Sequence, residues 1–281
     1  MLLHRYLASH ALETLQEGRL KVSLVSSFND PFECLFGVVG QMTRQKANAY
    51  LRRRYNEPDF LDEVIRNAPH LKLKTRKAAR RYIKANRKTG IEALASGFDK
   101  IKQSTREEQI KITDDSLRVV CFSASTATPY SEILMWSHYA NKHHGILIGF
   151  EFPALITGKF RIERMQYSRE RVAVDISDDV LSDPVQTALK LSLKTKSIAW
   201  EYENEYRLLT TRDVTTRDHT KPGFEFIPFD KAWVKEVTFG TRCPADVVVE
   251  CCELLKHKYP RAIRQRAKYH PTEYALEYTP V

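Results

Sequence analysis

The sequence predicts an α+β fold in which a mixed or antiparallel sheet is interrupted by a basic helical insertion. Short apolar segments with β-type patterns occur on both sides of a central segment whose apolar residues recur at three- and four-residue spacing. Positive charge is concentrated in that central segment. The chain has 281 residues and 42% hydrophobic content, which is enough apolar surface for a core. We therefore expect one domain, 1–281, with the insertion at 41–112.

The amino-terminal elements are expected to be a strand, a helix, a second strand and a sharp turn. In the turn, Pro31 fixes the backbone after Asn29 and Asp30, whose side chains can bond to their own main chain. This turn would present Asp30 and Glu33. The preceding segments are LLHRYL at 2–7, ALETLQEG at 11–18 and RLKVSLVSS at 19–27.

The insertion is expected to contain three or four helices between residues 42 and 111. Residues 41–112 hold nineteen Lys and Arg against eight Asp and Glu, a net charge of +11, whereas the whole chain carries +10. The rest of the chain is therefore close to neutral. A cationic block of this kind favours a polyanionic partner, of which nucleic acid is the commonest.

After the insertion the β-type pattern returns. Strands are expected at 116–125, 144–152 and 160–174, in the later part of 200–210, and at 233–240, 262–269 and 273–278. Helices are expected at 131–141, 183–199 and 245–259, the second of them capped by Asp183-Pro184.

Several classes of protein are disfavoured by composition and spacing. No stretch of about eighteen apolar residues occurs, and His4 and Arg5 interrupt the place where a signal peptide would be apolar, so we expect a cytoplasmic protein without a membrane partner. The five cysteines are scattered and indicate reduced thiols. Neither a GxSxG serine nor HExxH spacing is present, so a serine hydrolase and a zinc enzyme are disfavoured and no metal site is predicted.

The segment 203–207 carries the strongest chemical pattern. A strand period of two places Glu203, Glu205 and Arg207 on one face. Pairing with Arg207 would lower the pKa of one glutamate, and repulsion between the two acids would raise that of the other, as in catalytic carboxylates. The alternative is a solvated strand face with an ordinary ion pair.

Two aromatic residues lie three apart on the helix expected at 131–141. Trp136 and Tyr139 can belong to the core, or they can form a flat wall on which a planar heterocycle stacks. The pattern alone leaves both uses open.

One segment of the insertion predicts a basic amphipathic helix. Residues 70–90 hold nine Lys and Arg and no acidic residue. At 100° per residue, seven of them fall within an arc of about 140°. Like charges crowded on one face repel one another, so this face favours contact with nucleic acid, and next an acidic protein. The seven residues are Arg76, Lys77, Arg80, Arg81, Lys84, Arg87 and Lys88.

An ordered set of short motifs resembles a known family. HRY at 4–6, FNDPFE at 28–33, CFS at 121–123, WSHYA at 136–140 followed by HGILIGFE, and WEYENEYR at 200–207 are similar to an uncharacterised bacterial domain family often found beside toxin–antitoxin and phage-defence genes. The similarity runs from end to end apart from the basic insertion. That family in turn resembles, more distantly, the ADP-ribosyltransferase superfamily.

The resemblance implies a split ADP-ribosyltransferase-like sheet and NAD as co-substrate. Transfer of ADP-ribose passes through an oxocarbenium-like ribose, which a carboxylate stabilises. The glutamate pair of the superfamily would be Glu203 and Glu205, with Glu205 on the ribose and Glu203 orienting or deprotonating the acceptor. Glu201 adds a third alternating acid.

The resemblance also implies a set of NAD-binding residues. His4 or Arg5 would anchor NAD, and Arg5 is suited to the pyrophosphate. Ser123 would lie near the nicotinamide ribose. The candidates to stack on nicotinamide or adenine are Tyr6, Trp136 and Tyr139, and those for the pocket rim are Asn29 and Asp30.

The expected function is that of an NAD-dependent ADP-ribosyltransferase toxin or anti-phage effector that modifies RNA or DNA, with an antitoxin protein as a possible partner. One alternative is a metal-dependent nuclease in which Asp30, Glu203 and Glu205 bind a divalent ion. Another is a non-catalytic nucleic-acid-binding or interaction module.

Overall fold

The computed structural model describes residues 1–8, 10–103, 106–124, 129–153, 160–175 and 184–281. The chain forms two compact units. Unit 1 comprises residues 1–33, 110–169 and 194–281, and unit 2 comprises residues 34–109 and 170–193. Most of the basic segment therefore belongs to unit 2, whereas the candidate acids and the amino-terminal strand belong to unit 1.

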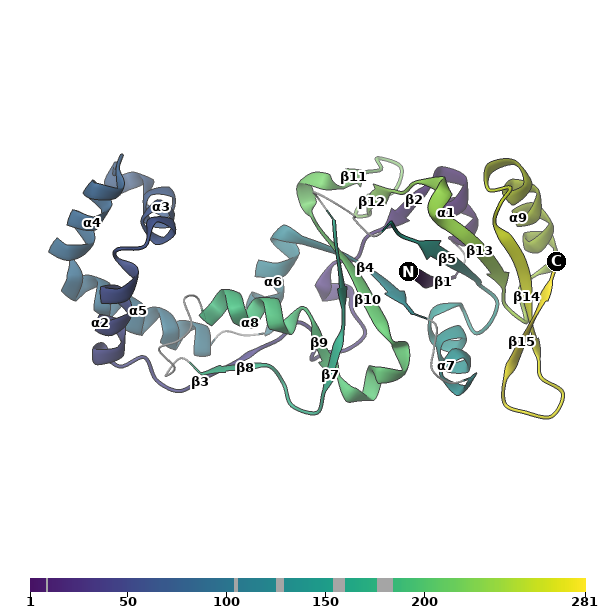
Figure 1. The fold of residues 1–281 in the computed structure, drawn as a ribbon, viewed down its shortest axis with the longest axis horizontal. Coiled ribbons are helices and arrows are strands. Elements are labelled where there is room, and N and C mark those ends of the chain that lie inside the picture. The colour runs from purple at the N-terminus through teal and green to yellow at the C-terminus, as the bar shows by residue number, and fades with distance from the viewer. Residues whose placement is uncertain (9, 104–105, 125–128, 154–159, 176–183) are drawn as a thin grey trace. The chain divides into compact units, whose positions relative to one another are not determined.

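Unit 1 is built on an eight-stranded mixed sheet of order β15-β14-β13-β5-β1-β4-β10-β6 (Figure 1). All neighbours are antiparallel except β13 and β14, which are parallel and are connected through helix α9 (Ala245–Lys258). The expected mixed sheet is confirmed. Its strands are β1 (Leu2–Leu7), β4 (Leu117–Ser123), β5 (Ile146–Glu151), β6 (Arg161–Arg164), β10 (Glu205–Thr211), β13 (Val234–Phe239), β14 (Ile263–Tyr269) and β15 (Leu276–Pro280).

Helices cover both faces of this sheet. On one face, α1 (Ala11–Glu17) and α9 lie side by side (Figure 1) and bury Leu15 and Leu255 in a core shared with Phe150 and Phe239. On the other face, α7 (Pro129–Tyr139) packs against β1 and buries Trp136. The three layers follow from strand alternation, because successive side chains of each strand point to opposite faces.

The pairing of β1 with β4 is limited. All residues of β1 and β4 are described by the structure, and one pair of residues, His4 and Ser123, lies directly opposite across them. By contrast, β1 and β5 pair along their whole length. β4 therefore meets the middle of β1 at its last residue, Ser123, and the two strands diverge along the rest of β4. This divergence leaves room for side chains between them.

The remaining elements of unit 1 are short. A three-stranded sheet has the order β11-β12-β2, and β7 pairs in parallel with β9. These strands are β2 (Arg19–Lys21), β7 (Gln166–Ser168), β9 (Thr195–Ser197), β11 (Thr216–Arg217) and β12 (Glu225–Pro228). The short 3-10 helices are η1 (Val25–Ser27), η3 (Ile198–Glu203), η4 (Arg212–Val214) and η5 (Lys231–Trp233).

Unit 2 is mostly helical, as the spacing predicts. Thr43 and Thr75 accept hydrogen bonds from the amides of Lys46 and Ala78 and so cap α2 and α4. The elements are β3 (Gly37–Val39), α2 (Arg44–Arg54), α3 (Pro58–Asn67), η2 (Pro69–Leu71), α4 (Arg76–Ala85), α5 (Arg87–Lys102), β8 (Ala173–Asp175) and α8 (Pro184–Ser192). Helix α6 (Arg106–Ser116) spans the boundary between the units.

Three expected elements differ from the structure. The strand expected at 19–27 ends at Lys21, and Val25–Ser27 form the 3-10 helix η1. The helix expected at 183–199 ends at Ser192, and residues 195–197 pair with β7 as strand β9, so this prediction is wrong beyond residue 192. Its expected cap, Asp183, lies outside the described residues. The strand expected at 160–174 is divided among β6, β7 and β8, which join three different partners.

Within the described ranges, no helix has both the length and the apolar character needed to cross a membrane.

Candidate functional site

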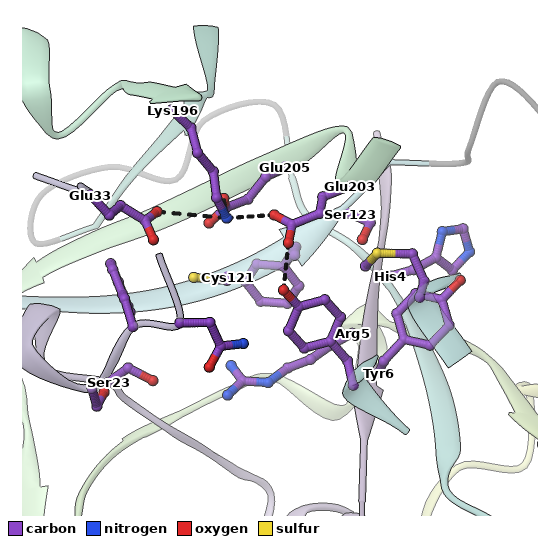
Figure 2. A pocket seen from close by; sticks show the side chains of 16 residues that line it. His4, Arg5, Tyr6, Ser23, Glu33, Cys121, Ser123, Lys196, Glu203 and Glu205 are labelled. Carbon is purple, nitrogen blue, oxygen red and sulfur yellow. Dashed lines mark hydrogen bonds and ion pairs between the residues drawn. The ribbon is translucent and has the colours of Figure 1, made fainter. Parts of the chain in front are cut away.

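A cavity of about 220 Å³ opens in unit 1 beside the point where β1 and β4 diverge (Figure 2). Its walls come from these two strands, the loop after β2, helix α7, strand β9 and the junction of η3 with β10. The lining residues are His4, Arg5, Tyr6, Ser23, Ser27, Phe28, Asn29, Glu33, Cys121, Phe122, Ser123, Met135, Tyr139, Lys196, Glu203 and Glu205.

A row of directly opposed residues crosses the sheet at this cavity. Glu205 pairs with Ser123, Ser123 with His4, His4 with Gly149, and Gly149 with Glu236. Directly opposed residues share a face of a sheet, and neighbouring strands are about 4.8 Å apart. The sheet therefore places Ser123 and His4 in a line between Glu205 at one end of the row and Glu236 at the other.

Five buried charged side chains, which we call the ion-pair cluster, line or underlie the cavity. The Lys196 ammonium donates to Glu203 Oε2 at 2.6 Å and to Glu205 Oε2 at 3.0 Å, and lies 3.7 Å from Glu33 Oε1 (Figure 2). Arg207 Nε donates to Glu205 Oε1 at 2.8 Å, and the same guanidinium forms an ion pair with Glu33. Three carboxylates thus face two cations, which leaves an excess of one negative charge when all are ionised.

Both acids of the expected pair line the cavity, but by a different local structure from the one predicted. Glu203 is the last residue of η3, and Asn204 adopts a left-handed conformation with φ of 43°. Strand β10 begins only at Glu205. The predicted strand alternation of Glu203 with Glu205 is therefore wrong, and the left-handed turn at Asn204 brings the two carboxylates to the same ammonium.

Burial sets the electrostatics of the cluster. It raises the pKa of Glu205 above its usual range, and the attraction of Lys196 opposes this shift while repulsion by Glu203 adds to it. Burial by itself lowers the pKa of Lys196, but the carboxylates of Glu205 and Glu203 outweigh it, so the ammonium is held protonated. Burial lowers the pKa of Arg207 to about 9, which leaves it a cation at neutral pH.

Two uncharged groups complete the acidic side of the cavity. Burial raises the pKa of the Cys121 thiol, the charge of Glu205 raises it further, and the thiol hydrogen-bonds to that carboxylate. The Tyr139 hydroxyl donates to Glu203 Oε1, and burial followed by the charge of Glu203 raises its pKa. Both groups are therefore neutral donors rather than nucleophiles.

Arg5 supplies a cation apart from the ion-pair cluster (Figure 2). Its Nη2 donates to the Lys21 carbonyl at 2.9 Å, and burial lowers the pKa of its guanidinium to about 10. In the described part of the chain, its buried Nη1 has no hydrogen-bond partner. A buried donor without an acceptor is rare in native proteins, so this nitrogen is available to an acceptor atom of a ligand.

His4 is held from the other side by Glu236. The His4 Nε2 and Glu236 Oε1 atoms are 2.6 Å apart. To reach His4, the Glu236 side chain crosses strand β5 at Gly149, where an added Cβ would lie only 2.5 Å from Glu236 Cγ. Glycine at 149 therefore provides the space for the His4–Glu236 contact.

A Gly149→Ala substitution is expected to lower the free energy of unfolding by about 1–3 kcal/mol, because the new methyl group displaces Glu236. Urea unfolding followed by circular dichroism measures this change. In a Glu236→Ala background the three atoms nearest to the new methyl group are absent, so the cost of the same substitution is expected to fall sharply. An equal cost in the two backgrounds would contradict the steric account.

The structure places the predicted NAD-binding residues in two groups. His4, Arg5, Tyr6, Asn29, Ser123 and Tyr139 line the cavity. Trp136 and Asp30 do not.

Both residues are buried and contact other parts of the protein. Trp136 is fully buried and packs edge-to-face on Tyr6, with ring centroids 5.3 Å apart. Asp30 is buried in its turn, where Oδ1 accepts from the Phe32 amide at 2.9 Å. The expected divalent-ion set of Asp30, Glu203 and Glu205 is not assembled, and no group of three or more His, Cys, Asp or Glu side chains within the described ranges is arranged to hold a metal ion.

The basic segment does not form one continuous helix, so the predicted single basic face is wrong. Helix α4 ends at Ala85, Asn86 follows as its cap, and α5 begins at Arg87. The break gives Arg87 and Lys88 a different helix axis from the other five cations.

Three of the seven predicted nucleic-acid-binding residues also hold unit 2 together. Arg76 forms a two-pronged ion pair with Asp62, at 2.7 and 2.6 Å. Arg80 Nε donates to the Tyr55 carbonyl at 3.3 Å, and Arg87 Nε donates to an Asn48 side chain. The others, which are exposed, are Lys77, Arg81, Lys84 and Lys88.

Sequence reasoning did not identify Lys196, Glu33, Cys121 or Glu236 as residues of the site. Glu33 belongs to a motif that was expected to form a rigid turn, which was a usable signal. Lys196 had none, because it lies in a segment that was expected to be helical. Glu236 reaches His4 only through the order of the strands.

Fold and site together define a mixed α/β protein with a buried, ion-paired cavity at the divergence of two central strands. Residues 135–208 match the model of a family described as a protein of unknown function, DUF2971. This stretch contains Lys196, Glu203, Glu205 and Arg207, and its match agrees with the expected similarity to an uncharacterised domain family. No curated protein and no solved structure matches the chain.

Proposed function

We propose that this protein is an NAD-dependent ADP-ribosyltransferase, with nucleic acid as its acceptor. One observation carries the proposal: the carboxylates of Glu203 and Glu205 enter the same cavity as His4, Arg5 and Ser123. This arrangement combines buried acids, which suit a developing cationic sugar, with donors that suit the rest of a dinucleotide.

The charges of the cavity fit the reaction. Expulsion of nicotinamide places positive charge on the ribose, and the ion-pair cluster offers a net negative charge on buried side chains. In this proposal Glu205 binds the ribose. A ribose hydroxyl would replace the thiol of Cys121 on this carboxylate, because a thiol is only a weak donor.

The other groups have roles that follow from their contacts. Glu203, which accepts from Tyr139 and Lys196, orients or deprotonates the acceptor. Arg5 directs its unpartnered Nη1 to the pyrophosphate. Sites for small molecules usually have volumes of about 300–1,000 Å³, so a cavity of about 220 Å³ suits the nicotinamide ribose and leaves the adenosine outside it.

Two measurements test the proposal on the purified chain. A thermal-shift titration with NAD is expected to raise the unfolding temperature, because a ligand that binds only the folded state stabilises it. Radiolabelled NAD incubated with RNA or DNA is expected to release nicotinamide and to label the nucleic acid. A folded preparation that neither binds NAD nor releases nicotinamide would refute the proposal.

Two parts of the proposal depend on the resemblance more than on the cavity. An ADP-ribosyltransferase-like split sheet is supported by the single register pair between β1 and β4. A role as a toxin or anti-phage effector, with an antitoxin partner, is tested by the growth of bacteria that express the protein. The same measurement is repeated with the genes that neighbour its own gene expressed as well.

A further inference from the structure

A second cavity, of about 370 Å³, lies within unit 2. Leu51 and Ile83 form its apolar surface, and Tyr55 and Asn56 add an aromatic ring and an amide. Three cations complete the lining, one from each of α2, α4 and α5. They are Arg52, Lys84 and Arg87.

These three cations have no carboxylate partner within the part of unit 2 that the structure describes. Two acids of this part of unit 2 have other partners, since Glu57 pairs with Arg54 at 2.7 Å and Asp62 of α3 pairs with Arg76. No acidic residue lines the cavity. It therefore has an uncompensated positive charge beside an aromatic ring.

Arg87 gives the clearest indication of a ligand. Its Nε donates to Asn48 Oδ1 at 2.7 Å, which fixes the guanidinium against α2. Its Nη2 is buried and has no hydrogen-bond partner in the described part of the chain. A fixed, buried guanidinium nitrogen without an acceptor fits the oxygen of a phosphate or carboxylate. Arg87 is also the first residue of α5, where the helix dipole favours an anion.

The part of the lining formed by Tyr55 is held in place as well. The Tyr55 carbonyl accepts from Arg80 Nε, so this basic residue holds the backbone of the aromatic wall. On α5, a Cβ at Gly90 would lie 3.3 Å from Leu51 Cδ1, which indicates close packing behind the apolar surface. The Tyr55 backbone and the Leu51 side chain are therefore both held by neighbouring residues.

We propose that this cavity binds a phosphorylated nucleoside, with the phosphate at Arg52, Lys84 and Arg87 and the base against Tyr55. An aromatic ring beside a cationic phosphate site is the arrangement that binds unpaired nucleotides. The volume admits one nucleotide rather than a continuous strand, so the ligand is a free nucleotide or the phosphorylated end of a strand. The inference deepens the nucleic-acid part of the proposed function and does not depend on NAD chemistry.

Fluorescence anisotropy with the full chain tests this proposal, without NAD. The probe is a short single-stranded oligoadenylate with a 5′-phosphate and a 3′ dye, compared with the same strand ending in a 5′-hydroxyl. Tighter binding of the phosphorylated strand is expected. If adenosine monophosphate displaces the phosphorylated strand, the cavity is a mononucleotide site. If the protein prefers the phosphorylated strand but adenosine monophosphate does not displace it, the cavity binds the end of a strand. Absence of both effects would overturn the proposal.

Matched double variants separate the cavity from general attraction by charge. Arg52→Gln with Lys84→Gln is expected to weaken binding of the phosphorylated strand by about tenfold or more, because each removes a charge-assisted contact. Lys77→Gln with Arg81→Gln removes the same charge outside the cavity lining and is expected to change affinity by about twofold. Equal losses in the two double variants would contradict a defined pocket.

A third variant tests the aromatic wall, with folding monitored separately. Tyr55→Leu keeps an apolar side chain but removes stacking, and it is expected to weaken binding of the base without affecting binding of inorganic phosphate. Circular dichroism reports whether each variant keeps its helices. Nicotinamide release from NAD alone is expected to be unchanged in all of them, so failure of this proposal and failure of the proposed transferase activity are distinguishable.

Discussion

Glu205→Gln is expected to reduce nicotinamide release from NAD by about 10²–10⁴-fold, the range that a positioned acid or base contributes. The substitution keeps the shape of the side chain and removes the charge that faces the developing cationic ribose. Release of labelled nicotinamide measures the loss. Glu201→Gln is the matched control, because Glu201 is exposed and does not line the cavity. It is expected to keep full activity, which would exclude Glu201 as the acting acid.

The fold of Glu205→Gln is expected to survive because its two cations keep other partners. Lys196 retains Glu203, and Arg207 retains Glu33. Loss of activity with an unchanged circular dichroism spectrum would therefore report on chemistry. Full activity in Glu205→Gln would contradict the role of Glu205. Loss of activity in Glu201→Gln would contradict the choice of the buried acids over the exposed one.

The composition of the cavity was partly predictable because its polar residues lie on regular, strongly patterned elements. His4 and Ser123 occur in short apolar segments that the sequence predicts as strands, and both acids of the expected pair are in the cavity. The backbone conformation that brings the two acids together was not predictable. The left-handed turn at Asn204 depends on contacts with distant residues, such as the hydrogen bond from the Ala124 amide to the Asn204 carbonyl.

Lys196 shows why local pattern fails at long-range pairing. The segment 183–199 has helical spacing, yet residues 195–197 pair with β7 and direct the ammonium into the ion-pair cluster. Strand pairing depends on partners that lie far away in sequence, so it overrides a local helical preference. The same limitation applies to Glu236, whose contact with His4 requires β13 to lie two strands from β1.

The basic segment illustrates a different error. A helical wheel assumes one continuous axis, and the change from α4 to α5 at Asn86 removes that assumption. The charge count was reliable, but the geometry of the charges was not. Their partners in the structure, Asp62 and Asn48, lie at positions that the wheel does not include.

Lys196→Met is expected to lower the free energy of unfolding at neutral pH by about 3–5 kcal/mol, the cost of leaving a buried charge without its partner. Methionine is similar in length but apolar, so Glu203 and Glu205 would remain buried beside each other. Urea unfolding measures the change. Lys194→Met is the matched control in the same segment, because Lys194 pairs with Glu163 at 2.8 Å in a more exposed position. Its expected cost is about 1 kcal/mol or less.

The pH dependence of that loss identifies its cause. Burial already raises the pKa of Glu205, and removal of the Lys196 charge raises it further. A carboxyl whose pKa is raised on folding contributes stability below its unfolded pKa and loses it as pH rises through the folded pKa. The deficit of Lys196→Met relative to the wild type is therefore expected to be small near pH 4 and complete at neutral pH. A deficit that does not change with pH would mean that Lys196 contributes by packing rather than by compensating the buried carboxylates.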